Sequence, residues 1–207
     1  VNDAFGEFCE HHAEMVAERE DNPEDSDLLL RWMHAEIDGQ KLEEEQLLFE
    51  HVLLLVGGAE TTRNAIAGGL EMLAKNPDQW AYLRANVDDE KVIAGAIEEM
   101  IRWVTPFNNM FRTATRDVEL RGKTIKEGQM IAMQYPSANR DPSMFKDPYK
   151  FDVKRDPKEE KHISFGFGSH FCLGANLARL ELRATLTTLL RKIETLGIAP
   201  GGRNEIM

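Results

Sequence analysis

The chain has 207 residues, 42% of them hydrophobic and 29% charged, which is enough for one sizeable hydrophobic core or a large part of a bigger one. With 36 acidic against 25 basic residues the net charge is −11, and this disfavours nucleic acid as a partner because the overall field repels phosphate. The two cysteines lie far apart and no apolar run approaches membrane-spanning length, so we expect a reducing, cytoplasmic location, no disulfide framework and no membrane span.

The first part of the chain is predicted to be helical. Residues 1–20 form an amphipathic pattern that ends at a polar break over 21–26. A short helix follows over 28–33, and Asp38-Gly39 is interpreted as its stop signal. From about 42 to 75 the pattern stays helical, and its centre, 52–56, is apolar all round, which predicts burial.

The second part mixes short helices with strands. Pro77 begins one helix, and another runs from about 89 to 104 and stops before Pro106. The period then changes to that of strands over about 111–137, with a hairpin at 118–125. A proline-rich irregular stretch covers 139–164, and a final helix over about 174–195 closes a mainly α architecture with a small β-sheet.

A glycine-rich loop, Phe165-Gly-Phe-Gly-Ser-His-Phe-Cys-Leu-Gly174, leads into that final helix. It sets Cys172 at the mouth of the helix, where the dipole and unpaired backbone N–H groups favour a thiolate. Gly168 and Gly174 allow a flat partner to lie close, and a thiolate beside a planar clearance is what an axial haem ligand needs. The spacing fits F-x-x-G-x-x-x-C-x-G, and in this the chain resembles the cytochrome P-450 family, notably its bacterial soluble members.

Two adjacent glycines, Gly57 and Gly58, precede Glu60 and Thr61 within the long helix. Interior glycines cost a helix about 0.5–1 kcal/mol each relative to alanine, so they require a reason. They allow either the close crossing of another helix or the approach of a large flat ligand, beside which an acid and an alcohol could deliver protons. The resemblance favours the second reading, because this run is similar to the family's oxygen-activating motif.

Glu99 and Arg102 form an i, i+3 pair, which taken alone is an ordinary solvated pair. The pair also matches the family's E-x-x-R, and Arg155 stands where the third member of that buried network would be. The resemblance therefore implies that these three residues anchor the irregular stretch beneath the cysteine loop.

The resemblance also assigns roles to residues around a haem b and its substrate. Arg112 and His170 would bind the haem propionates, since a guanidinium suits a carboxylate, although His170 alone could be an exposed loop histidine. A hydrophobic, steroid- or terpenoid-like substrate would be lined by residues that are individually compatible with plain core packing: Leu53, Val56, Val104, Phe107, Asn108 and Met110.

On this resemblance the chain is one partial domain over 1–207, the C-terminal, haem-proximal half of the cytochrome P-450 fold. It implies a monooxygenase that inserts one oxygen atom from O2 into a C–H bond, with Cys172 as the iron ligand and a ferredoxin-type donor and its reductase supplying electrons. Two alternatives remain: a truncated, non-catalytic haem-binding module, and a peroxide-driven oxidase of the same fold. A hydrolytic role for Cys172 ranks last because it lacks an oriented base.

Overall fold

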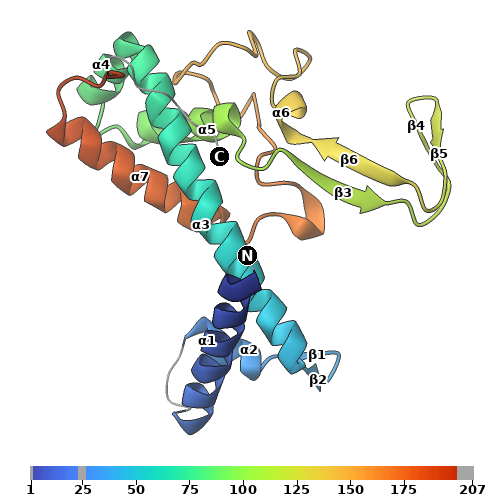
Figure 1. Ribbon diagram of the computed structural model, residues 1–207. Helices are drawn as coiled ribbons and strands as arrows, with labels where there is room; N and C mark the ends of the chain where they lie inside the picture. Colours follow the sequence, from blue (N-terminus) through green and yellow to red (C-terminus); the bar gives the residue numbers. More distant parts are fainter. Residues whose placement is uncertain (1, 23–26, 200–207) are drawn as a thin grey trace. The chain divides into compact units, whose positions relative to one another are not determined.

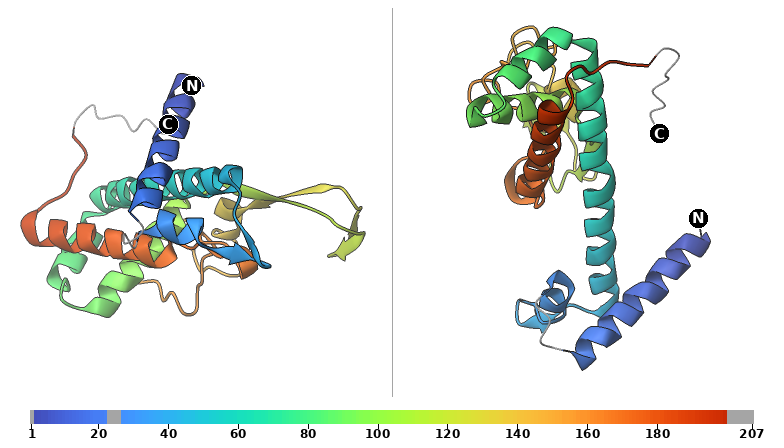
Figure 2. Two further views of the ribbon diagram at one scale, coloured as in Figure 1. Left: turned by 90° about the horizontal axis from the view of Figure 1, so that it is seen from below. Right: turned by 90° about the vertical axis from the view of Figure 1, so that its left-hand side faces the viewer.

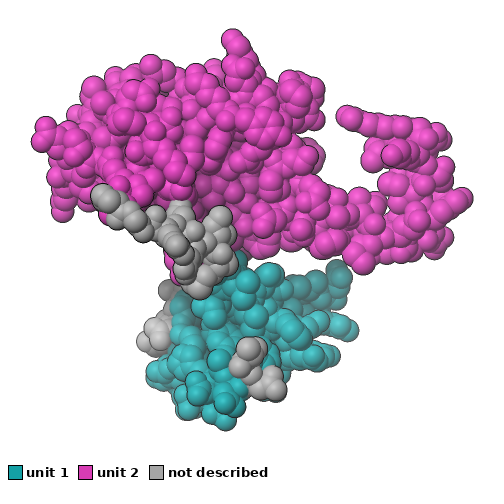
Figure 3. All heavy atoms as spheres, turned by 45° about the horizontal axis from the view of Figure 1, so that its top comes forward, with its two compact units in different colours: residues 1–60 teal, residues 61–207 magenta. Residues whose placement is uncertain are grey.

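The computed structural model describes residues 2–22 and 27–199, and most of the polar break expected at 21–26 lies outside this range (Figure 1). The chain divides into two compact units, residues 1–60 and 61–207, which are coloured separately in Figure 3. The expectation of one partial domain over 1–207 stays a prediction. Within the described residues, each helix is either too short or too polar to cross a lipid bilayer.

The first unit begins with α1 (Asn2–Asp21) and α2 (Leu28–Met33). Asp27 caps α2 by accepting a hydrogen bond from the Leu30 N–H at 2.9 Å, and it also pairs with Arg19 of α1. This one carboxylate therefore ties the two helices together.

A hairpin follows α2 where the sequence was interpreted as a helix stop. Strands β1 (Glu36–Ile37) and β2 (Gln40–Lys41) pair antiparallel, and the turn between them is Asp38-Gly39 with φ values of 52° and 78°. Two left-handed residues in succession make the two-residue turn that Asp-Gly favours. The interpretation of Asp38-Gly39 was wrong because strands of two residues carry no detectable alternation.

Helix α3 (Glu44–Lys75) is the longest element and contributes to both units. The expectation that its apolar centre is buried was wrong, since Leu53, Leu54, Leu55 and Val56 are 44–65% exposed. An all-round apolar helix is buried only if other elements surround it. The described residues of the first unit leave these four side chains uncovered.

The second unit is built on α5 (Glu90–Val104), with α7 (Ala175–Lys192) beside it and α4 (Pro77–Ala85) beside α7 (Figure 2). Asp89 caps the start of α5, and Thr105 ends it in a left-handed conformation (φ 43°) before Pro106. The apolar residues of α5 recur at helical spacing and are buried together with those of its neighbours: Ala65, Leu73, Trp80, Leu83, Ile93, Ile97, Met100, Ile101, Leu182, Leu186 and Leu190.

The small β region consists of two separate antiparallel pairs. Strand β3 (Asn109–Thr113) pairs with β6 (Met130–Gln134), with Phe111 opposite Ala132, and this ribbon extends away from the helices (Figure 1). Strands β4 (Val118–Leu120) and β5 (Lys123–Ile125) form the predicted hairpin, turning at Arg121-Gly122. The chain then enters the short α6 (Tyr135–Ala138).

From 139 to 167 the chain has no regular element, as predicted for this proline-rich stretch. Phe151 and Val153 nevertheless lie in the core, 3% and 2% exposed. A 3-10 turn, η1 (Gly168–His170), precedes Cys172. This long irregular stretch therefore packs firmly on the helices, and its order must come from contacts other than a helix or strand ladder.

Candidate functional site

The cysteine loop is closed on itself by backbone hydrogen bonds. The Cys172 N–H donates to the Phe165 carbonyl at 2.9 Å, and the Gly166 N–H donates to the Ile163 carbonyl at 2.8 Å. Gly166 and Gly168 have φ values of 74° and 77°, a region that glycine enters without strain. Cys172 is an exposed free thiol, three residues before α7 begins.

The surface around this thiol is apolar and open. Phe167 is 92% exposed and Leu173 88%, and Phe171 lies against the Phe165 ring with centroids 6.2 Å apart. A Cβ added at Gly168 would meet nothing within 4 Å, and one at Gly174 would meet only the Cys172 Sγ at 4.0 Å. Exposed apolar side chains beside a glycine clearance indicate a surface that a flat, hydrophobic ligand would cover.

The donor set fits iron held in a macrocycle better than a bare ion. In the described part of the chain, no three His, Cys, Asp or Glu side chains come together in a way that would hold a metal ion. One exposed thiol could hold an iron that a porphyrin also binds through its four nitrogens. The residues around Cys172 are therefore suited to a haem.

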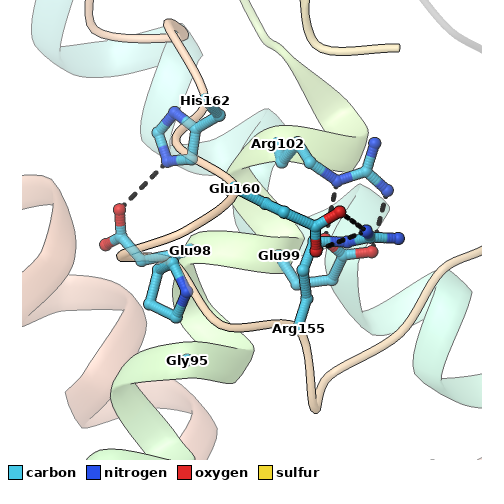
Figure 4. A pocket seen from close by; sticks show the side chains of 8 residues that line it. Gly95, Glu98, Glu99, Arg102, Arg155, Glu160 and His162 are labelled. Atoms are coloured by element: carbon cyan, nitrogen blue, oxygen red, sulfur yellow. Dashed lines mark hydrogen bonds and ion pairs between the residues drawn. The ribbon is translucent and has the colours of Figure 1, made fainter. Parts of the chain in front are cut away.

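A buried ionic network lies on α5. Arg102 donates to Glu99 through Nε at 2.6 Å and Nη2 at 2.8 Å, and Arg155 Nε reaches the same carboxylate at 3.2 Å (Figure 4). The three side chains are 0%, 1% and 7% exposed for Glu99, Arg102 and Arg155. Removing one member of such a network leaves an uncompensated buried charge, which costs about 3–5 kcal/mol. The pair is thus not the ordinary solvated one.

Arg102 also organises the irregular stretch. It donates to the carbonyl oxygens of Asn139 at 2.8 Å, Pro148 at 3.0 Å and Lys150 at 3.2 Å. Glu99 in turn accepts from the Asp152 N–H at 2.8 Å. These hydrogen bonds give partners to backbone N–H and carbonyl groups that lie outside any helix or strand.

Sequence reasoning missed Asn139, which is fully buried. Its amide donates to the hydroxyls of Thr105 and Ser164 at 2.9 and 2.8 Å, and its oxygen accepts from the Ile163 N–H at 2.8 Å. Asn139 thus links the end of α5 to the start of the cysteine loop. The only signal available was its position in Ser137-Ala-Asn-Arg-Asp-Pro142, which carries no spacing that predicts these partners.

A second ionic group, which sequence reasoning also missed, is built around Glu98, the residue before Glu99 on α5. Glu98 points away from Glu99, toward His162, whose Nε2 lies 3.0 Å from its carboxylate (Figure 4). Burial alone would raise the pKa of Glu98, but hydrogen bonds from Arg179 and His162 outweigh it and lower that pKa to about 2. The cavity between the two groups encloses about 10 Å³, room for at most one water molecule, so it cannot hold a substrate.

The two expected propionate ligands lie on different elements of the second unit. Arg112 is exposed on β3, where its Nη1 donates to the Phe111 carbonyl at 2.8 Å, and His170 is exposed in η1. Both are accessible to a ligand, and their roles stay predictions.

The residues expected to take part in oxygen activation are divided between the units. Gly57, Gly58 and Glu60 belong to the first unit, and Thr61 opens the second. A Cβ added at either glycine would meet nothing within 4 Å, so within the described chain no helix crosses closely there. Their approach to Cys172 stays a prediction.

The close helix crossing occurs instead at two glycines that the sequence analysis passed over. A Cβ at Gly68 would lie 2.7 Å from Val104 Cγ2, and one at Gly69 would overlap Met100. These two glycines allow α3 to pack directly on α5.

The expected substrate-lining residues are also divided between the units. Leu53 and Val56 are exposed on α3 of the first unit, whereas the others lie in the second, at the end of α5, in the following turn and on β3: Val104, Phe107, Asn108 and Met110. Phe107 and Met110 are each 39% exposed, so apolar surface is available there. The complete lining stays a prediction.

The comparisons with known proteins agree on one family. The family model described as Cytochrome P450 matches residues 1–198. A steroid C26-monooxygenase of Mycolicibacterium smegmatis is 42% identical over 197 residues, covering 95% of this chain and 48% of that protein. The putative cytochrome P450 126 of Mycobacterium tuberculosis is 43% identical over 202 residues, covering 96% of this chain and 47% of that protein.

Solved structures give the same result. CYP109E1 from Bacillus megaterium in complex with testosterone superposes with a TM-score of 0.85 at 30% identity, over 96% of this chain and 53% of that one. CYP108D1 from Novosphingobium aromaticivorans gives a TM-score of 0.84 at 37% identity, over 95% of this chain and 46% of that one. The chain spans about half the length of the relatives it matches.

Proposed function

The chain belongs to the cytochrome P450 family, and from this we propose that it forms the haem-thiolate half of a monooxygenase acting on a hydrophobic substrate. The observation that carries the proposal is Cys172, an exposed thiol on a glycine-rich loop at the start of α7. A haem bound there would supply the reductive activation of O2 and the transfer of one oxygen atom to a C–H bond.

The residues of this chain have distinct tasks in the proposal. Cys172 ligates the iron, and Arg112 and His170 bind the propionates through charge-assisted hydrogen bonds. Glu60 and Thr61 pass protons toward the site of oxygen reduction, because an acid and an alcohol on one helix turn can exchange protons with water. Electrons come from a ferredoxin-type donor with its reductase.

For the substrate we propose a steroid or a compound of similar shape. The support comes from relatives at 42% identity that are named steroid C26-monooxygenases, and from the structural neighbour that was solved with testosterone. The apolar surfaces of Leu53, Val56, Phe107 and Met110 suit such a ligand, with Asn108 as a polar contact.

A second candidate is a haem-binding module without catalytic activity, which the half-length coverage favours. A peroxide-driven oxidase of the same fold is less well supported, because the Glu60-Thr61 pair has no task where oxygen is not reduced. Turnover with peroxide but never with a ferredoxin system would favour that oxidase.

The test of the proposed function is a carbon monoxide difference spectrum of the haem-loaded, dithionite-reduced chain, with Cys172→Ser and Cys9→Ser alongside. We expect a strongly red-shifted Soret band that Cys172→Ser abolishes and Cys9→Ser retains, because only a thiolate ligand produces the shift. A haem band without the red shift in the wild type would contradict thiolate ligation. No haem uptake would exclude the site in this chain alone, and the same pair of variants in a protein of the full length of the relatives (the longer protein) would then decide.

A further inference from the structure

A polar cluster connects α5, α7 and the start of the cysteine loop, and the proposed function gives it no task. It consists of Glu98 on α5, His162 in the irregular stretch and Arg179 on the second turn of α7. Arg179 donates to Glu98 through Nε at 2.6 Å and Nη2 at 2.9 Å, which is the paired, fork-like geometry that only arginine provides. The side chains are largely shielded, with His162 6%, Glu98 19% and Arg179 35% exposed.

The histidine of this cluster is held in one tautomer. The Ser164 N–H donates to His162 Nδ1 at 3.2 Å, so that nitrogen is an acceptor and the proton resides on Nε2. Nε2 then donates to Glu98 Oε2 at 3.0 Å. His162 therefore orients the carboxylate and, at the same time, fixes the backbone at the entrance of the cysteine loop.

Arg179 acts on the loop through an aromatic ring. Its guanidinium carbon lies 4.6 Å from the centroid of the Phe165 ring, and that ring also contacts His162. The carbonyl of Phe165 accepts the hydrogen bond from the Cys172 N–H. An uninterrupted series of contacts thus leads from Glu98 to the residue that carries the thiol.

The cluster also holds two opposite charges at the Phe165 end of the loop. The hydrogen bond to Glu98 raises the pKa of Arg179, which keeps Arg179 cationic at neutral pH. Glu98 is the opposing charge, since its low pKa keeps it ionised at neutral pH.

We propose that Arg179 is a positioning residue for Cys172: held by Glu98 and His162, its guanidinium fixes the Phe165 end of the cysteine loop and keeps a cation at that end of the loop. This inference rests on the proposed role of Cys172 as the haem ligand.

The first experiment uses the chain without haem and measures amide hydrogen exchange over residues 165–174. We expect Arg179→Gln to accelerate exchange in this segment by about tenfold or more, because the paired bonds to Glu98 and the contact of the guanidinium with the Phe165 ring are lost. Arg183→Gln is the matched control: it lies one turn further along α7, and its ion pair with Glu90 (3.4 Å) is exposed. If the Arg179→Gln variant does not fold, the same exchange measurement is made on Arg179→Lys. This variant keeps the cation but lacks the paired hydrogen bonds of the guanidinium. Equal exchange in the Arg179 and Arg183 variants would overturn the proposal.

The second experiment distinguishes an effect of the charge of Arg179 from an effect of loop structure alone. It measures the ferric/ferrous midpoint potential of the haem-bound longer protein. Arg179→Gln should lower the potential and Glu98→Gln should raise it, because the two variants remove charges of opposite sign. Arg179→Lys should restore the wild-type value. Shifts in the same direction for both neutralising variants would overturn the electrostatic part. If the wild type bound no haem, the proposed function would fail, but the exchange experiment would still decide the positioning of the loop.

Discussion

Two histidines, His12 of α1 and His51 of α3, meet in the interior of the first unit. Their Nδ1 atoms lie 2.9 Å apart, His12 is 3% exposed, and within the described residues its Nε2 is buried without a hydrogen-bond partner. Burial lowers the pKa of both residues. The charge of His51 lowers the pKa of His12 further and outweighs the opposite effect of Glu44. The charges of His11 and Arg19 lower the pKa of His51 further. Protonation of this pair is therefore disfavoured in the folded state.

We predict that the first unit loses stability in mild acid because of these two residues. With a folded pKa below the ordinary 6.5, the unfolded chain binds more protons, so stability is full above about pH 6.5 and falls as the pH decreases through that value. His12→Leu should flatten this dependence, as measured by urea unfolding at about pH 8 and pH 5. His11→Leu is the control, because His11 is exposed. An unchanged acid response in His12→Leu would exclude the pair as its cause.

At the level of elements, two pairs of glycines on α3 have opposite surroundings. Gly68 and Gly69 lie against Val104 and Met100, whereas an added Cβ at Gly57 or Gly58 meets open space. Helix propensity treats all four alike, since each costs the helix the same backbone entropy. The residues that contact a helical glycine, and not the sequence of its helix, therefore decide whether the glycine is needed for packing.

We predict that Gly68→Ala destabilises the chain by about 1–3 kcal/mol, because the new methyl group overlaps the stiff side chain of Val104. Gly58→Ala should instead stabilise it by about 0.5–1 kcal/mol through helix propensity. Urea unfolding of the two variants side by side tests both. If Gly58→Ala also weakens haem uptake, the clearance at Gly58 serves the ligand; destabilisation by both variants alike would contradict the assignment.

The helices and the hairpin at 118–125 were predictable because their signals are local: Pro77 at a helix start, Asp89 as a cap, Thr105-Pro106 as a stop. The Glu99–Arg102 pair was also local, three residues apart. Asn139, Glu98 and His162 were not predictable from spacing, since their partners lie 24 to 81 residues away. The prediction of short strands such as β1 and β2 failed for a different reason, because two residues cannot show the alternation of apolar and polar side chains that marks a strand.

At the scale of the whole molecule, the described chain leaves apolar surface exposed on α3. Residues 53–56 expose four consecutive large apolar side chains, more than a stable monomer normally leaves uncovered. The relatives are about twice as long as this chain, and we propose that in a protein of that length the further residues cover this surface.

This proposal predicts a difference between the chain and the longer protein. In the chain alone, Leu53→Gln with Leu55→Gln should change the free energy of unfolding by less than about 0.5 kcal/mol, because both side chains are exposed, and should reduce the binding of a hydrophobic dye. In the longer protein the same changes should cost about 1.5–3 kcal/mol for each side chain buried. A negligible cost in both would favour the independent haem-binding module.

The arrangement around Arg102 has a consequence for the order of folding. Its ionic partner Glu99 lies on the same helix, but the carbonyl groups it binds come from residues 37, 46 and 48 positions further along the chain. Helix α5 can therefore form early as a local structure, with its cation in place, whereas the segment of 139–150 must close long loops to reach it. We therefore expect this segment to acquire its shape on docking, with α5 as the template on which the approach to the cysteine loop is assembled.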